Sequence, residues 1–197
     1  MQMPVLATLS GTDQVTGWID QSGSNNSLSS TGNPILVNNA ISFDKDGNKL
    51  ERLADISLHS GNADRTMFLV ANYNSVGEGG FTYGAPSEDK TFGLPGSQDG
   101  DLKFKAWGRS GDSESDFAGT GQGWLSQSVI LSDGVINLYK DGVLLDKWHG
   151  CTFRTTDYTY TKTQNLLATI CSVTLSKIFK EIRLKQRYRW LSISNNQ

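Results

Sequence analysis

The chain has 197 residues, of which 37% are hydrophobic and 19% charged, and it contains 21 glycines. This length suits one domain with its own hydrophobic core, and the composition excludes a disordered, collagen-like or coiled-coil chain. The longest uninterrupted apolar run, residues 67–71, is far shorter than the roughly 18 residues of a membrane-spanning helix. We therefore expect a single domain over residues 1–197 with no membrane span.

The net charge of −2 conceals an uneven distribution. Residues 1–150 carry 10 Lys and Arg against 18 Asp and Glu, whereas residues 151–197 carry 8 against 2. The two parts should attract each other. The basic stretch 177–189 is a small part of an otherwise acidic chain, and solvated strand faces often carry such charges, so no nucleic-acid partner is expected.

The start of the chain and its cysteines bear on its compartment. The N-terminus has no basic leader and no long apolar segment, so no secretory signal is visible, whether because it was removed or because none existed. Cys151 and Cys171 are too few for a disulfide scaffold, and their spacing matches no zinc motif. Both a bridge between them and two buried thiols are compatible with the sequence.

Short runs rich in β-branched and aromatic residues predict the strands. In chain order they are residues 5–9, 35–37, 40–44, 49–53, 66–73, 80–84, 101–107, 124–131, 135–140, 143–148 and 166–171. The run 66–73 is almost entirely apolar, which predicts a central strand covered on both faces. The run 101–107 alternates strictly, which predicts a half-buried strand. Many short strands without helices between them favour an all-β, antiparallel, two-sheet β-sandwich.

Turns and loops are predicted from glycine and its neighbours. Four Asp-Gly pairs, beginning at Asp46, Asp99, Asp133 and Asp141, suit tight turns because both residues tolerate positive φ. Two segments rich in Gly, Ser and Asn, residues 21–33 and 108–123, predict long surface loops. Residues 175–184 fit the period of a helix and that of a strand equally.

Several motifs together resemble a known family. Residues 15–26 read VTGWIDQSGSNN and are followed by AISFD (40–44), TMFLV (66–70), VINLYKDGVL (135–144) and FKEIRLKQR (179–187). Their order resembles the concanavalin A-like, laminin-G-type jelly-roll domains, which have matching opening, strand and hairpin motifs. The resemblance implies a jelly roll with Trp18 and Phe43 in the core and a strand within residues 175–184. Residues 151–164 have no counterpart, so the pairing of residues 150–175 stays open.

The sequence lacks the signatures of common catalytic sites. His59 and His149 form no metal-binding doublet, and the GRSGD segment at 108–112 has Asp where a hydrolase elbow needs Gly. Some jelly-roll relatives are glycanases with an E-x-D-x-x-E strand, but residues 114–119 read ESDFAG, and Gly119 replaces the second carboxylate. We predict no catalytic residue.

Calcium is an alternative that the resemblance adds, since loop acids and amides bind it in related lectin domains. Residues 44–48 resemble the start of an EF-hand calcium loop. Lys49 and Asp55, however, occupy the positions where an EF-hand has Gly and Glu, so a hairpin turn is the preferred interpretation there. The candidate metal ligands are Asp44, Asp46, Asn48, Asp112, Glu114 and Asp116.

Aromatic rings bind sugars by stacking on the apolar face of a pyranose while polar neighbours bind its hydroxyls. Each such ring can instead pack in the hydrophobic core. For Trp107 and Trp124 core packing is the more common outcome, because large aromatic side chains are usually mostly buried. The candidate carbohydrate-binding residues, all in or beside Gly-rich segments, are Phe81, Tyr83, Trp107, Arg109 and Trp124.

Three functions follow as hypotheses. The first is a non-catalytic carbohydrate-binding or adhesion module, with a polysaccharide or other glycan as partner and an extracellular, cell-surface or virion location. The second is a structural or decoration protein of a virion or cell surface that uses the sandwich for protein docking or homo-oligomer assembly. The third is a polysaccharide hydrolase or lyase. Exposed Trp or Tyr on an open surface would favour the first, and a flat apolar surface the second.

Overall fold

The computed structural model describes residues 7–21, 24–43, 47–52, 58–73, 80–84, 90–95, 101–104, 106, 113–118, 123–149 and 166–169. Within these ranges the chain is entirely β-structure and turns. The same ranges contain no helix long and apolar enough to cross a membrane. The strands are β1 (Ala7–Ser10), β2 (Gln14–Trp18), β3 (Leu28–Thr31), β4 (Ile35–Val37), β5 (Ala40–Phe43), β6 (Lys49–Glu51), β7 (Arg65–Tyr73), β8 (Gly80–Gly84), β9 (Thr91–Pro95), β10 (Asp101–Phe104), β11 (Ser113–Ala118), β12 (Trp124–Ser132), β13 (Val135–Lys140), β14 (Val143–Trp148) and β15 (Leu166–Thr169).

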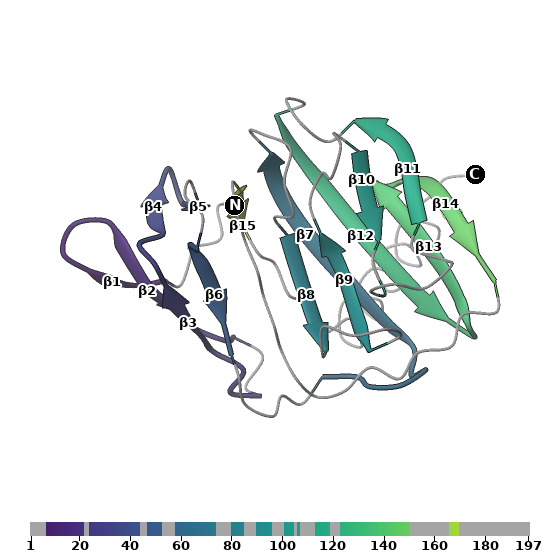
Figure 1. The fold of residues 1–197 in the computed structure, drawn as a ribbon, viewed down its shortest axis with the longest axis horizontal. Helices are drawn as coiled ribbons and strands as arrows, with labels where there is room; N and C mark the ends of the chain where they lie inside the picture. The colour runs from purple at the N-terminus through teal and green to yellow at the C-terminus, as the bar shows by residue number, and fades with distance from the viewer. Residues whose placement is uncertain are drawn as a thin grey trace, which may run out of the picture.

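The strands form two layers. Ten of them make one antiparallel sheet in the order β14-β13-β12-β7-β15-β5-β4-β2-β3-β6, and β1 adds to β2. The pair β8-β9 lies over β7 and β12, and β10 continues this second layer beside β9, with its partner β11 against β14 (Figure 1). The fold is an all-β, antiparallel two-layer sandwich, which confirms the predicted fold class.

Strand β7 is central, as predicted, since β12 and β15 pair with its two edges. Its residues alternate between buried and half-buried along the whole strand. Leu69 and Ala71 are fully buried beneath the second layer, whereas Phe68 and Val70 on the other face are half-buried. Full burial is therefore shown for the face beneath the second layer and partial burial for the other, a difference that an apolar run in the sequence does not reveal.

The hydrophobic core lies between the large sheet and the β8–β11 layer. Phe92 and Phe104 contact each other edge-on, with ring centroids 5.2 Å apart, and both are buried against residues of β7 and β12. Phe43 is fully buried and Trp18 packs partly buried against the same cluster, which confirms the core positions that the resemblance implied for them.

Two of the four Asp-Gly turns form as predicted. Asp133 and Gly134 have φ of 50° and 72°, and Asp141 and Gly142 have φ of 49° and 80°. Two successive left-handed residues between paired strands make a type I′ hairpin turn, whose twist matches that of the strands.

The other two Asp-Gly pairs begin at Asp46 and Asp99, and both aspartates lie outside the described residues. The strands that flank Asp46 do not pair with each other among the described residues: β5 pairs with β4 and β15, and β6 pairs with β3. The predicted hairpin at this position was wrong, because the chain crosses to another part of the sheet.

Both predicted long loops contain a strand. Strand β3 lies within residues 21–33 and pairs with β2 and β6, and β11 lies within residues 108–123 and pairs with β10. Ladder hydrogen bonds need only the backbone, so Ser-rich segments join a sheet when neighbouring strands offer an edge. Strand β9 was also missed, although Phe92 and Leu94 are fully buried, because Gly93 and Pro95 interrupt the strand pattern. Cys151, Cys171 and residues 175–184 lie outside the described residues.

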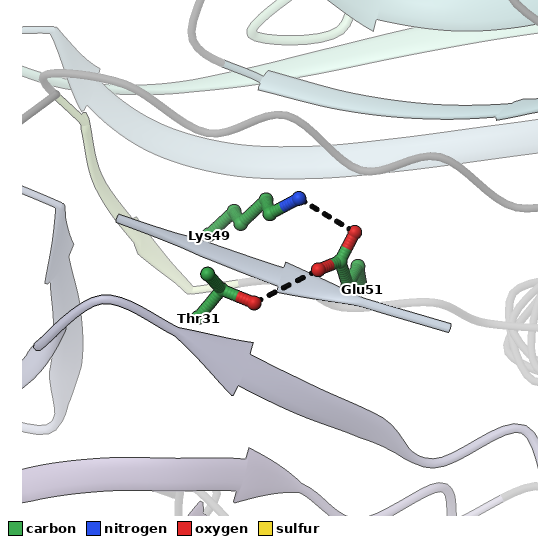
Figure 2. Close-up of polar contacts among 3 residues, drawn as sticks. All are labelled: Thr31, Lys49 and Glu51. Atoms are coloured by element: carbon green, nitrogen blue, oxygen red, sulfur yellow. Dashed lines mark hydrogen bonds and ion pairs between the residues drawn. The ribbon is translucent and has the colours of Figure 1, made fainter. Parts of the chain in front are cut away.

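Strand β6, at one end of the large sheet, is joined to β3 by polar side chains (Figure 2). Lys49 Nζ lies 2.7 Å from Glu51 Oε2, and Thr31 Oγ1 donates a hydrogen bond of 2.8 Å to Glu51 Oε1. Partial burial raises the pKa of Glu51, but the hydrogen bonds from Lys49 and Thr31 and the charge of Lys49 outweigh it, so the net pKa is lowered.

This lowered pKa makes a pH-dependent prediction. A carboxylate whose pKa is lower in the folded state stabilises the fold above its unfolded pKa, and the contribution is lost as the pH falls through the folded pKa. We expect Glu51→Gln to reduce the unfolding free energy by no more than about 1 kcal/mol at pH 7, as is usual for surface ion pairs. In urea denaturation, the difference from wild type should shrink steadily as the pH is lowered from 7 to about 3. A difference that persists unchanged at that pH would contradict the prediction.

Candidate functional site

Four adjacent strands present a row of side chains on the face of the large sheet that lies opposite the β8–β11 layer. Directly paired residues of neighbouring strands point to the same side of a sheet, so the ladder registers define this surface. We call it the open face. Its members on β7, β12, β13 and β14 are Thr66, Phe68, Val70, Asn72, Trp124, Ser126, Ser128, Ile130, Asn137, Tyr139, Leu144 and Lys147.

At one end of the open face, Trp124 lies directly opposite Asn72. The next pair on the same face is Ser126 and Val70. The Trp124 side of β12 is the exposed one, since Leu125 beside it is buried and Trp124 itself is 50% exposed. An aromatic ring with half its surface in solvent therefore stands beside an amide and a hydroxyl group.

The middle of the open face combines aromatic, hydroxyl and apolar groups. Ser128 lies between Phe68 and Tyr139, and Tyr139 pairs in turn with Leu144 on β14. Leu144 is 48% exposed, whereas the two rings are half-buried. The surface therefore alternates between side chains that can pack on a ligand and side chains that can hydrogen-bond it.

The other end of the open face carries its charge. Ile130 lies between Thr66 and Asn137, and Asn137 pairs with Lys147 on β14. Lys147 is exposed and is the one charged side chain among the described members of the face. The face thus runs from an aromatic end at Trp124 to a cationic end at Lys147.

Asp141, in the β13–β14 turn, fixes the strand next to Trp124. Its backbone N–H donates to Ser126 O at 2.8 Å, and its carboxylate Oδ1 accepts from Ser126 N at 2.8 Å. The same Oδ1 lies 3.3 Å from Ser126 Oγ, which belongs to the open face. Asp141 thereby extends the hydrogen bonding of β12 toward Trp124, past the last ladder pair with β13.

Behind the open face, Tyr73 and Gln127 share a hydrogen bond within the core. Tyr73 Oη donates a hydrogen bond of 2.6 Å to Gln127 Oε1, and both residues are buried. Burial raises the pKa of Tyr73 far above its ordinary value, so this hydroxyl stays protonated. The pair links β7 to β12 and serves the rigidity of the sheet.

Arg65 is a second buried polar residue behind the face. Its Nη1 donates to His59 O at 3.1 Å, and its guanidinium lies 4.3 Å from the centroid of the Phe92 ring. Burial lowers the pKa of Arg65, while the nearby Tyr83 raises it slightly. An arginine remains charged under such a shift, and its cation–π contact stabilises it.

Of the predicted carbohydrate-binding residues, Trp124 is the one that the structure places with an exposed ring. Phe81 and Tyr83 lie in β8 and belong to the hydrophobic core. Tyr83 Oη donates to His59 O at 2.8 Å, and its ring centroid lies 5.9 Å from that of Phe92. Trp107 and Arg109 lie outside the described residues.

Of the six predicted calcium ligands, Asn48 is the one whose side chain the structure describes. Asn48 is buried, and its Oδ1 accepts a hydrogen bond of 2.8 Å from Asn33 N, which braces the turn before β6. Glu114 and Asp116 lie in β11, and Asp44, Asp46 and Asp112 lie outside the described residues. No group of three or more His, Cys, Asp or Glu able to hold a metal occurs in the described ranges. Calcium binding stays a prediction.

Most members of the open face were missed from the sequence. The alternation of residues 124–131 groups Trp124 with Ser126 and Ser128, so that part of the signal was present. Phe68 and Tyr139 could join them only through the pairing of β12 with β7 and β13, which a single sequence does not reveal.

No protein-family model and no curated protein matches the chain. Among solved structures, it is similar to a Trypanosoma rangeli sialidase in complex with 2,3-difluoro-KDN (12% identity, TM-score 0.49), covering 86% of this chain and 27% of the sialidase. It is also similar to domain 4 of AbnA, a GH43 extracellular arabinanase from Geobacillus stearothermophilus in complex with arabinotriose (15% identity, TM-score 0.39; 84% of this chain, 69% of that one). A third similar structure is the Polysaccharide Lyase family 7 alginate lyase AlgAT5 (14% identity, TM-score 0.36), and the match covers 79% of this chain and 82% of the lyase. The chain thus spans about a quarter of the sialidase, and at these scores the likenesses carry no functional argument.

Proposed function

We propose that the chain is a non-catalytic carbohydrate-binding module of the concanavalin A-like, laminin-G-type kind, and that it binds a glycan on the open face. The observation that carries the proposal is the 50% exposed ring of Trp124 beside Asn72, on a face whose other polar groups are mainly hydroxyls and amides. Glycan binding also agrees with the extracellular, cell-surface or virion location expected from the sequence.

The chemistry of the open face matches the two surfaces of a sugar. The Trp124 ring offers an apolar plane for the C–H face of a pyranose. Ser126, Ser128 and Asn137 can each donate to and accept from sugar hydroxyls. Because these groups stand on paired strands instead of loops, little ordering is needed when a ligand binds.

The proposal is tested with a panel of polysaccharides in affinity electrophoresis. The panel holds neutral members (β-glucan, xylan, arabinan, galactan and methyl-esterified polygalacturonate) and anionic members (polygalacturonate, alginate and hyaluronan), each with and without millimolar calcium. We expect at least one member to retard the protein and no member to yield new reducing ends or unsaturated products. Migration unaffected by every member would overturn the proposal, and product formation would favour the hydrolase or lyase hypothesis.

Protein docking is a second candidate function, supported by a different observation. Val143 is 63% exposed and Leu144 is 48% exposed, and both lie on β14, the strand at one end of the large sheet. Exposed apolar residues on an end strand are typical of a surface that another protein covers. Sedimentation velocity at increasing concentration tests this function: assembly that Val143→Ser weakens would support it, and a strict monomer would count against self-assembly.

A further inference from the structure

We infer that Asp141 makes the open face selective for neutral over anionic glycans. The inference rests on the proposed function and adds to it the chemical class of the ligand and the residue that sets it. Its basis is the position of one carboxylate at the aromatic end of the face, at the place where a stacked sugar would lie.

The geometry places this carboxylate close to the stacking site. Asp141 Oδ1 lies 3.3 Å from Ser126 Oγ, and Ser126 is the next residue after Trp124 on the same face of β12. Residues two apart in a strand are separated by about 7 Å. A sugar stacked on Trp124 that reaches Ser126 therefore has its substituents within a few ångströms of a negative charge.

The fixed position of the carboxylate strengthens the effect. Asp141 Oδ1 also accepts a hydrogen bond of 2.8 Å from Ser126 N, and the Asp141 backbone is held by Ser126 O. The side chain is therefore not free to swing away from a ligand carboxylate. A sugar hydroxyl, by contrast, can donate a hydrogen bond to such an oxygen, which favours an uncharged ligand.

Lys147 carries the opposite charge, but it lies too far from Trp124 to offset the repulsion by Asp141. Lys147 shares a row with Ile130, which is six residues from Trp124 along β12. That separation is about 20 Å, roughly two and a half times the Debye length at physiological salt. An anionic sugar at Trp124 thus meets the repulsion of Asp141 without the attraction of Lys147. At about 6 Å in a largely aqueous setting, such repulsion weakens binding about three- to tenfold.

The test compares wild type with Asp141→Asn and Asp133→Asn on the polysaccharide panel described above, with polygalacturonate and its methyl ester as the matched pair. Asparagine tolerates the left-handed backbone, and its Oδ1 can accept the same hydrogen bonds from Ser126, so only the charge is removed. Asp133 is the matched control, because it occupies the equivalent Asp-Gly turn at the other end of β12. Thermal unfolding of each variant confirms that the fold is retained.

We expect wild type to bind the neutral members of the panel more tightly than the anionic ones. Asp141→Asn should reduce the neutral-to-anionic affinity ratio about three- to tenfold, and Asp133→Asn should leave this ratio unchanged. In wild type the same ratio should shrink when salt is raised to about 0.5 M, a readout that does not depend on any variant. Anionic members bound as tightly as neutral ones, or a ratio that Asp141→Asn does not move, would overturn this inference but leave glycan binding intact. Failure to bind any member would overturn the proposed function itself.

Discussion

Replacing Phe92 by alanine is expected to lower the free energy of unfolding by about 3–5 kcal/mol, the range for deleting a large buried aromatic side chain. Phe92 is fully buried in β9, and its ring contacts Phe104 and Tyr83 and lies beneath the guanidinium of Arg65. The substitution leaves a cavity between the two layers and removes the nearer of the two rings that the buried Arg65 guanidinium contacts. Urea denaturation measures the change.

Two controls separate this effect from a general sensitivity to substitution. Phe92→Leu retains apolar volume and should cost clearly less than Phe92→Ala. Val143→Ala, at a side chain that is 63% exposed, should change the stability by no more than about 0.5 kcal/mol. A loss below about 1 kcal/mol for Phe92→Ala would show that the β8–β9 pair does not cover the large sheet.

Trp124→Ala is expected to weaken glycan binding about 10- to 100-fold, equivalent to about 1.4–2.8 kcal/mol, because an exposed aromatic platform supplies most of the contact area at such sites. Stability should hardly change, since the ring is already 50% exposed and contributes little to the core. Isothermal titration with the best-bound polysaccharide of the panel measures the affinity, and thermal unfolding measures the stability.

Trp124→Phe keeps a smaller ring and should retain part of the affinity. Leu9→Ala is the control at a distant exposed apolar residue, 44% exposed on β1, and should bind like wild type. Equal affinity of wild type and Trp124→Ala would remove Trp124 from the site. A matching loss in Leu9→Ala would show that the binding is a nonspecific property of exposed apolar groups.

The fold was predictable from the sequence where side-chain pattern and turn chemistry agree. The segment 135–148 carries apolar strands around Asp141-Gly142, and the structure has the strands and the turn at the predicted residues. The Ser-rich strand β3 gave no such signal, since its side chains are mostly exposed and the pairing is made by the backbone. Strand β9 was hidden by Gly93 and Pro95, which ordinarily mark loops.

The candidate site was predictable only in part for a related reason. Trp124 stood out as an aromatic residue beside glycine, but so did Phe81 and Tyr83, and the sequence does not distinguish an exposed ring from a buried one. The distinction arises from tertiary contacts: Tyr83 binds the His59 carbonyl and packs on Phe92, whereas the Trp124 ring is 50% exposed. Asp141 was predicted as a turn residue, and its link to Ser126 depends on how β12 passes the β13–β14 hairpin.

Binding of a glycan on the open face can be mapped by titrating the isotope-labelled protein with the best-bound glycan of the panel and recording ¹⁵N–¹H correlation NMR spectra. We expect the largest shifts on the Trp124 indole and on the amides of Asn72, Ser126, Ser128 and Tyr139. Shifts confined to the β8–β11 layer, or to the β1–β6 end of the large sheet, would contradict it.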